Sequence, residues 1–270
     1  TERKEYVDDV LGLNILPTTD AIKPYAGGEY VNTKQDMALL EGIKDRHGTA
    51  PGVITSRAAL NVYQQDDALE YDPEDGDVLE GPADRVKYYG NVLGSNEFKH
   101  TRVGAVIGSQ HYGDGFIKKW GALAGKAVER NDGKGTDLSY GSFGDRVLTH
   151  MREHETLQAT MRFGRDGNGA NVYVNTNTLP EWVPTAGEGR VINCWSDGMK
   201  QVLEAAGERD TFRTREIADH PAVDISTRQV RDHLNTLAER GYLGREYDGN
   251  GYVYQEDGLH KVTEHGDVEI

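Results

Sequence analysis

The sequence predicts an α/β protein, in which a lobe built on a largely parallel, buried sheet is followed by a smaller α+β domain. Helical and strand-like segments alternate over most of the chain, as they do in layered α/β folds. The strand-like runs, such as Val103–Ile107, are continuously apolar, which is typical of strands covered on both faces. A chain of 270 residues can form two hydrophobic cores. We therefore expect domains over residues 1–189 and 190–258, and a tail over 259–270.

Apolar periodicity and turn residues assign the elements of the first domain in order. Residues 1–32 are interrupted by Pro and Gly and form a poorly defined lead-in, after which Thr33 is expected to cap the first helix. Residues 66–84, rich in Asp, Glu, Gly and Pro, indicate an exposed acidic loop, and residues 131–144 a glycine-rich linker. The pattern predicts helices over 34–46, 58–64, 115–129 and 145–163, and strands over 52–56, 86–89, 103–107 and 171–176.

The second domain has the clearest pattern. Ser226 and Gln229 form a capping box, in which each side chain reaches the backbone N–H of the other residue, and this box opens a helix that ends at Gly241. Two helices are predicted before it, over 195–206 and 214–219. Two strands are predicted after it, over 243–247 and 252–255, joined by the Asp-Gly-Asn-Gly turn of a hairpin.

The composition limits the classes of function. Acidic residues outnumber basic ones 45 to 30, for a formal charge of -15, and they are dispersed along the chain. Such a surface favours a cytoplasm with high salt, as in a halophilic archaeon, and it counts against nucleic-acid binding except through a local basic face. The single cysteine, Cys194, has no intrachain partner for a disulfide and favours a reducing compartment. No apolar run approaches the ~20 residues of a membrane-spanning helix, so we expect a cytoplasmic protein without membrane contact.

The stretch Gln158-Ala159-Thr160-Met161-Arg162-Phe163-Gly164-Arg165 ends the long helix predicted over 145–163. Arg162 and Arg165 lie three residues apart, so both can project from one side of the helix end. Guanidinium groups placed in this way neutralise the negative charge that phosphoryl transfer spreads over the phosphate oxygens. The alternative is a surface helix with ordinary arginines.

These eight residues resemble the sixth motif of superfamily-two helicases, in which a Gln shortly precedes Gly-Arg-x-Gly-Arg. The match departs at Met161, where the family usually has Gly. Residues 89–98 and 103–110 resemble the segment of motifs four to five more loosely, and the resemblance covers roughly residues 35–180. It implies a RecA-like C-terminal lobe in which Arg162, Arg165 and Gln158 act in catalysis, with Gln158 and Arg165 contacting ATP.

The sequence has no G-x-x-x-x-G-K-[ST] phosphate loop and no strand that ends in an Asp-Glu pair for magnesium. The resemblance therefore implies that ATP and Mg are bound mainly by an N-terminal ATPase lobe, which would precede Thr1 in a longer parent protein. The chain begins at Thr1 rather than Met, and we expect it to be a piece of that parent that does not hydrolyse ATP alone.

A competing motif lies on the same helix. His150-Met151-Arg152-Glu153-His154 fits H-x-x-E-H, the inverted zinc-protease signature, and helical spacing would place His150 and His154 on one face. No downstream Glu stands out as a third ligand, and a charged, solvated helix face explains the same residues. We therefore predict no metal site, and a zinc hydrolase remains a minor alternative.

The second domain resembles a winged helix, with the helix after Ser226 as its recognition helix. The wing offers Arg245 and Tyr254 to flanking DNA backbone. Asp232 and Glu239 on the same helix leave a protein-docking role open. The side chains expected to contact phosphates and base edges are Thr227, Arg228, Arg231, His233 and Asn235.

Two functions follow from these patterns. The first is the C-terminal portion of an ATP-dependent DNA helicase or translocase, acting in the replication of an archaeal plasmid or virus, with DNA and the N-terminal ATPase lobe as partners. The second is a non-enzymatic winged-helix regulator that binds DNA.

Overall fold

The chain folds into two units, each with its own core. The computed structural model describes residues 2–92, 96–259, 262 and 266–269. Unit 1 comprises Thr1–Arg190 with Glu269–Ile270, and unit 2 comprises Val191–Val268. Residues 93–95, on which part of the helicase resemblance rests, and the side chain of Cys194 lie outside the described residues.

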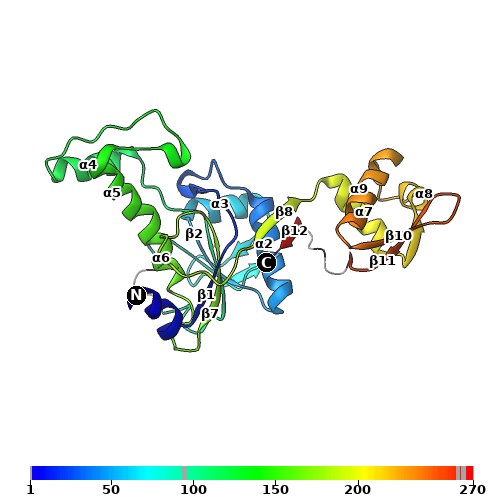
Figure 1. Ribbon diagram of the computed structural model, residues 1–270, viewed down its shortest axis with the longest axis horizontal. Helices are drawn as coiled ribbons and strands as arrows, with labels where there is room; N and C mark the ends of the chain where they lie inside the picture. The colour runs from blue at the N-terminus through cyan, green and yellow to red at the C-terminus, as the bar shows by residue number, and fades with distance from the viewer. Residues whose placement is uncertain (1, 93–95, 260–261, 263–265, 270) are drawn as a thin grey trace. The chain divides into compact units, whose positions relative to one another are not determined.

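Unit 1 is built on a five-stranded sheet in which every neighbouring pair of strands is parallel (Figure 1). Every residue of the strands 52–55 and 103–107 is buried, which confirms the prediction drawn from their continuous apolar runs. The α/β class with a parallel sheet is therefore correct. In spatial order the strands are β1 (Leu13–Pro17), β7 (Ala170–Asn175), β6 (Val103–Ile107), β2 (Gly52–Thr55) and β5 (Arg85–Tyr88).

Helices cover both faces of this sheet. The main helices of unit 1 are α2 (Thr33–His47), α3 (Arg57–Gln65), α4 (Asp114–Leu123), α5 (Gly141–Thr149), the π-helical turn η4 (His150–His154) and α6 (Glu155–Thr160), of which α4 and α5 extend away from the sheet (Figure 1). Helix α6 lies on one side of the sheet and α2 and α3 on the other (Figure 1). The smaller elements are α1 (Glu2–Glu5), η1 (Tyr6–Val10), η2 (Tyr25–Gly27), η3 (Gly135–Asp137), β3 (Glu70–Tyr71) and β4 (Val78–Glu80).

The structure corrects several boundaries in unit 1. The lead-in contains the edge strand β1, and the acidic loop contains the hairpin of β3 and β4. Asn32, not Thr33, caps α2, because its side chain accepts from the Gln35 N–H. Helix α4 ends at Leu123 rather than at residue 129, since Gly125 adopts a positive φ of 62°.

Unit 2 contains three helices and a three-stranded antiparallel sheet with the strand order β10-β11-β9. The capping box of Ser226 and Gln229 is formed as predicted, and Val230, Leu234 and Leu237 are buried in the core. The strand β9 was not predicted. The elements are α7 (Asp197–Gly207), β9 (Thr211–Arg213), α8 (Thr214–Ala218), α9 (Thr227–Glu239), β10 (Leu243–Tyr247) and β11 (Tyr252–Glu256).

The strands β8 (Arg190–Cys194) and β12 (Gly266–Glu269) pair with each other in a separate two-stranded sheet. Part of the segment expected to be a tail therefore takes part in strand pairing. None of the described helices is both long enough and apolar enough to cross a bilayer.

Candidate functional site

The helix that runs through α5, η4 and α6 forms one wall of a cavity of about 500 Å³. Gln158, Arg162 and Arg165 all line this cavity, so the structure brings together the three residues of the helicase-like motif. We call it the arginine pocket. The other lining residues are Tyr6, Leu11, His150, His154, Glu155, Leu157 and Met161.

The arginine pocket is cationic, and no ion pair to Arg162 or Arg165 is found among the described residues. Burial lowers the pKa of Arg162, and the neighbouring Arg165 lowers it further. The Arg162 Nε is buried and has no hydrogen-bond partner among the described residues. Glu155 is the one carboxylate in the lining, and burial raises its pKa. An anionic group in this pocket would therefore meet guanidinium groups that no described carboxylate occupies.

The residues between α6 and β7 fix the direction of the two arginines. Phe163 packs on the sheet at Gly104, where an added Cβ would lie 2.6 Å from its ring. Gly164 has a φ of 59°, and a Cβ there would lie 2.5 Å from the carbonyl oxygen of Gly169. The Gly between the two arginines is thus required by the backbone, and the buried Phe holds the end of the helix in place.

Asp166 anchors the same turn from the other side. Its carboxylate accepts hydrogen bonds from the Arg102 guanidinium, one of them at 2.7 Å, and contacts His100 Nδ1 at 2.8 Å. The bonds from Arg102 hold the pKa of Asp166 far below its usual range. Asp166 is thus paired with Arg102 and His100, and no ion pair between Asp166 and Arg165 is found among the described residues.

Comparisons with known protein families, with curated proteins and with solved structures find no significant match.

The H-x-x-E-H motif occupies the π-helical turn. The rings of His150 and His154 lie 4.6 Å apart, and both face the arginine pocket. Among the described residues, no group of three or more His, Cys, Asp or Glu side chains is arranged to hold a metal ion. The histidine pair therefore lacks a described third ligand, and the carboxylate of Glu155 interacts electrostatically with both rings.

In unit 2 the predicted DNA-contacting residues separate into two groups. Thr227, Arg228 and Arg231 are exposed on α9. His233 is half-buried against α7, where its Nε2 would lie 3.4 Å from a Cβ at Gly198, and burial lowers its pKa. The first group is free to meet a partner, whereas His233 faces the core side of the helix.

The expected role of Tyr254 in the wing is wrong. Its ring is buried and stacks on Phe212 with centroids 6.0 Å apart, so it belongs to the core of unit 2. Its hydroxyl donates to Asn235 Oδ1 at 3.1 Å, and Arg245 donates to the same oxygen at 2.8 Å. These three residues link α9 to the hairpin. Asn235 and Arg245 are thus engaged with each other before any partner arrives.

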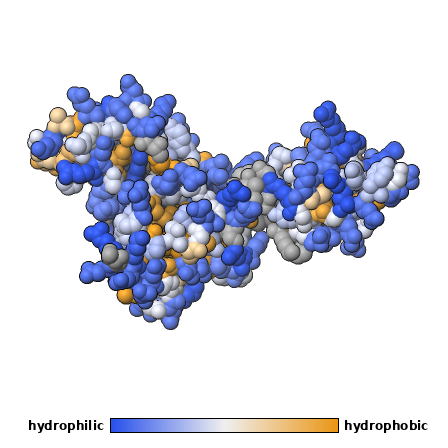
Figure 2. All heavy atoms as spheres, in the orientation of Figure 1, coloured by the Kyte–Doolittle hydropathy of each residue, from blue (hydrophilic) through white to orange (hydrophobic). Residues whose placement is uncertain are grey.

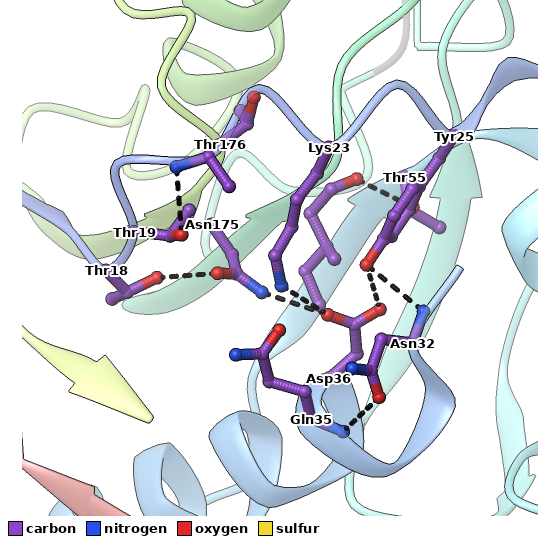
Figure 3. Close-up of polar contacts among 12 residues, drawn as sticks. Thr18, Thr19, Lys23, Tyr25, Asn32, Gln35, Asp36, Thr55, Asn175 and Thr176 are labelled. Atoms are coloured by element: carbon purple, nitrogen blue, oxygen red, sulfur yellow. Dashed lines mark hydrogen bonds and ion pairs between the residues drawn. The ribbon is translucent and has the colours of Figure 1, made fainter. Parts of the chain in front are cut away.

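Sequence reasoning missed a buried polar cluster in unit 1. Figure 3 shows Lys23, Tyr25 and Asn175 converging on the carboxylate of Asp36. Their donor atoms lie 3.1, 2.8 and 3.0 Å from its oxygens, and the Tyr63 hydroxyl donates at 2.8 Å. We call these five residues the Asp36 cluster. The signal was present in the sequence, because Asp36 stands four residues before Leu40 on the buried face of α2.

Proposed function

We propose that unit 1 is the arginine-finger lobe of an ATP-dependent nucleic-acid motor of the superfamily-two helicase type. The observation that carries this proposal is the arginine pocket, where Arg162 and Arg165 line one cavity without a described carboxylate partner. The five-stranded parallel sheet supports a RecA-like lobe, and the position of the pocket just before β7 agrees with the order of the helicase motifs.

Arg165, Arg162 and Gln158 have different roles in the proposed chemistry. Arg165 is exposed at the rim and would neutralise charge that develops on a transferring phosphoryl group when a second lobe closes over it. Arg162 is partly buried and would support the same charge from deeper in the pocket, with the Gln158 amide as a hydrogen-bonding neighbour. ATP brings the phosphoryl group to be transferred. Magnesium does not fit here, because Glu155 is the only lining carboxylate.

The test is ATP turnover by the protein in which this chain works beside a lobe with a phosphate loop. Arg165→Ala should lower kcat by roughly 10³- to 10⁵-fold while the Kd of the nucleotide changes little. Arg209→Ala, at an exposed arginine of unit 2, is the matched control and should retain turnover. Wild-type turnover by Arg165→Ala would disprove the arginine-finger role.

For unit 2 we propose a winged helix that binds duplex DNA. The order of helices and strands and the antiparallel sheet support this fold. Arg228 and Arg231 support the binding role, since they are exposed in the first turns of the capped helix α9. This observation also favours a second candidate function, a DNA-binding regulator without enzymatic activity, because such binding needs no ATP.

Duplex binding by the full chain, measured across a range of potassium chloride concentrations, tests the role of unit 2. Arg228→Ala together with Arg231→Ala should weaken binding and reduce the slope of log K against log salt by about two, since each phosphate contact contributes ~0.9. An unchanged slope would indicate that α9 contacts a protein instead. ATP turnover in the previous experiment separates the motor from the regulator.

A further inference from the structure

A second cavity of unit 1, of about 690 Å³, lies beside the loops that follow β1 and β6. Its lining includes Pro24 and Tyr30 from the first loop and His111–Gly113 from the second. Because β1 and β6 run parallel in one sheet, both loops leave the same edge, the one formed by the carboxyl ends of the strands. Ligands of open parallel sheets bind at this edge. We call this cavity the edge cavity.

The edge cavity carries an excess of positive charge. Arg130, Lys134 and Arg152 line it, against Glu29 as the one acid of the lining. The Arg152 Nε is buried and has no hydrogen-bond partner among the described residues. Burial also lowers the pKa of Arg152, which means that its charge is held there at a cost. An anion bound in the cavity would offset that cost.

One neighbouring carboxylate, Asp114, supplies a counter-charge to Arg130, whereas Arg152 has none among the described residues. Asp114 is already engaged, since it accepts from the Tyr140 hydroxyl and pairs with Arg130 at 3.3 Å. Burial lowers the pKa of His111, and Arg152 lowers it further. The Nδ1 of His111 accepts the Gly113 N–H at 3.0 Å, so its remaining proton is on Nε2, which is a donor.

A row of aromatic rings continues from the cavity along α4. The ring centroids of Tyr112 and Phe116 lie 4.9 Å apart, and those of Phe116 and Trp120 lie 6.2 Å apart. Tyr112 and Trp120 expose 42% and 48% of their surface, although aromatic residues of this size are usually covered. Figure 2 shows apolar residues at the surface in the part of unit 1 where Figure 1 labels α4.

The surroundings of this row are basic in an otherwise acidic chain. Residues 111–134 contain five Lys or Arg and three Asp or Glu, whereas the whole chain has a formal charge of -15. Lys118, Lys119 and Lys126 are exposed, and the described residues offer no carboxylate within ion-pair distance of them. The aromatic row thus belongs to a locally basic segment, and a nucleic-acid interface in an acidic chain requires such a segment.

We propose that the edge cavity and the row Tyr112–Phe116–Trp120 bind a single strand of nucleic acid. The cavity takes a backbone phosphate between Arg130, Lys134 and Arg152, and the exposed rings stack on bases. Exposed aromatic side chains beside a cationic groove are the combination that single strands need, because their bases are unpaired and present both faces. This role goes beyond the function proposed above, since it requires neither a phosphate loop nor α9.

Fluorescence anisotropy of the full chain with a labelled oligothymidylate of about 20 nucleotides tests the proposal, since single-strand sites span ~4 to 16 nucleotides. Arg130→Ala with Lys134→Ala should weaken binding and reduce the salt slope by about 1.4, at ~0.7 for each phosphate of a single strand. Trp120→Ala should weaken binding about ten-fold with an unchanged slope, whereas Trp120→Phe retains most of it.

Arg209→Ala with Arg215→Ala is the matched control, because it removes the same charge from two exposed arginines of unit 2 to which no binding role is assigned. It should leave oligothymidylate binding unchanged. The proposal is overturned if wild-type chain has no affinity for the oligonucleotide at any salt concentration, or if thymidine monophosphate binds equally well. It is also overturned if Trp120→Ala instead dissociates a dimer in sedimentation, since the row would then be an interface between copies.

Discussion

The Asp36 cluster and the edge cavity place buried charge in opposite circumstances within one unit. Asp36 is fully buried, and its carboxylate accepts from four donors, including the ammonium of Lys23. Arg152 is partly buried and none of the described carboxylates pairs with it. The fold itself therefore supplies partners for the carboxylate of Asp36, whereas it supplies no described carboxylate for Arg152.

This difference separates structural charge from charge that is available to a ligand. The Asp36 cluster joins the segment after β1, the helix α2 and the end of β7, so it holds the lead-in against the sheet. Arg152, like Arg162 in the arginine pocket, has a buried Nε without a partner among the described residues. Native proteins rarely leave such groups unsatisfied without a functional reason.

The largest expected effect on stability is at Asp36, the buried charge whose hydrogen-bond partners belong to the fold. Asp36→Ala removes the acceptor of Lys23 and leaves a buried ammonium without a counter-charge, so the free energy of unfolding should fall by about 3 to 5 kcal/mol. Urea denaturation measures it. Asp45→Ala, at an exposed position of the same helix, is the control and should stay within ~0.5 kcal/mol of wild type. If both variants lost the same small amount of unfolding free energy, Asp36 would not be a structural charge of the kind described above.

A smaller effect is expected at Asp166, whose partners lie at the surface. The pKa of Asp166 is lowered in the folded state, chiefly by hydrogen bonds from Arg102, so its stabilising contribution is complete above the unfolded pKa of ~3.9. This contribution should disappear as the pH falls below that value. We expect the stability difference between wild type and Asp166→Asn to be constant near neutrality and to shrink in acid. A difference that grows in acid would contradict the assignment.

The smallest effect on stability is expected at Arg152, the buried charge without a described partner. Arg152→Met removes a charge that burial penalises and keeps much of the side-chain volume, so the free energy of unfolding should be unchanged or higher by about 1 kcal/mol. Thermal denaturation measures it, and oligothymidylate affinity should fall in the same variant. A marked loss of stability would show that Arg152 supports the fold rather than a ligand.

The sequence predicted those elements whose signals are local. The capping box at Ser226 and the buried run Val103–Ile107 depend on neighbouring residues alone, and both are formed. Strand β1 was missed because it is short and acquires its partner, β7, from more than 150 residues away. Tyr254 was misplaced because pairing with β9, which was not predicted, carries its ring into the core.

In the candidate sites, too, features with a local sequence signal were predicted and features assembled from distant residues were not. The spacing of Arg162 and Arg165 predicted that both project from one side of the helix end, and both line the arginine pocket together with Gln158. The edge cavity could not be predicted, because it assembles residues from loops after two strands and from η4. Residues 131–144 were interpreted only as a linker, although Lys134 and Arg130 beside it face this cavity.

The π-helical turn η4 sets the rotational phase between the two ends of a single helix. Arg152 within it faces the edge cavity, while His150 and the arginines after it face the arginine pocket. Removing one residue from such a turn restores the α-helical ladder and rotates one end by about 100° relative to the other. Deleting one residue of η4 would therefore change the angle between Arg152 and the arginines that follow it, so that these side chains would no longer face their two cavities together.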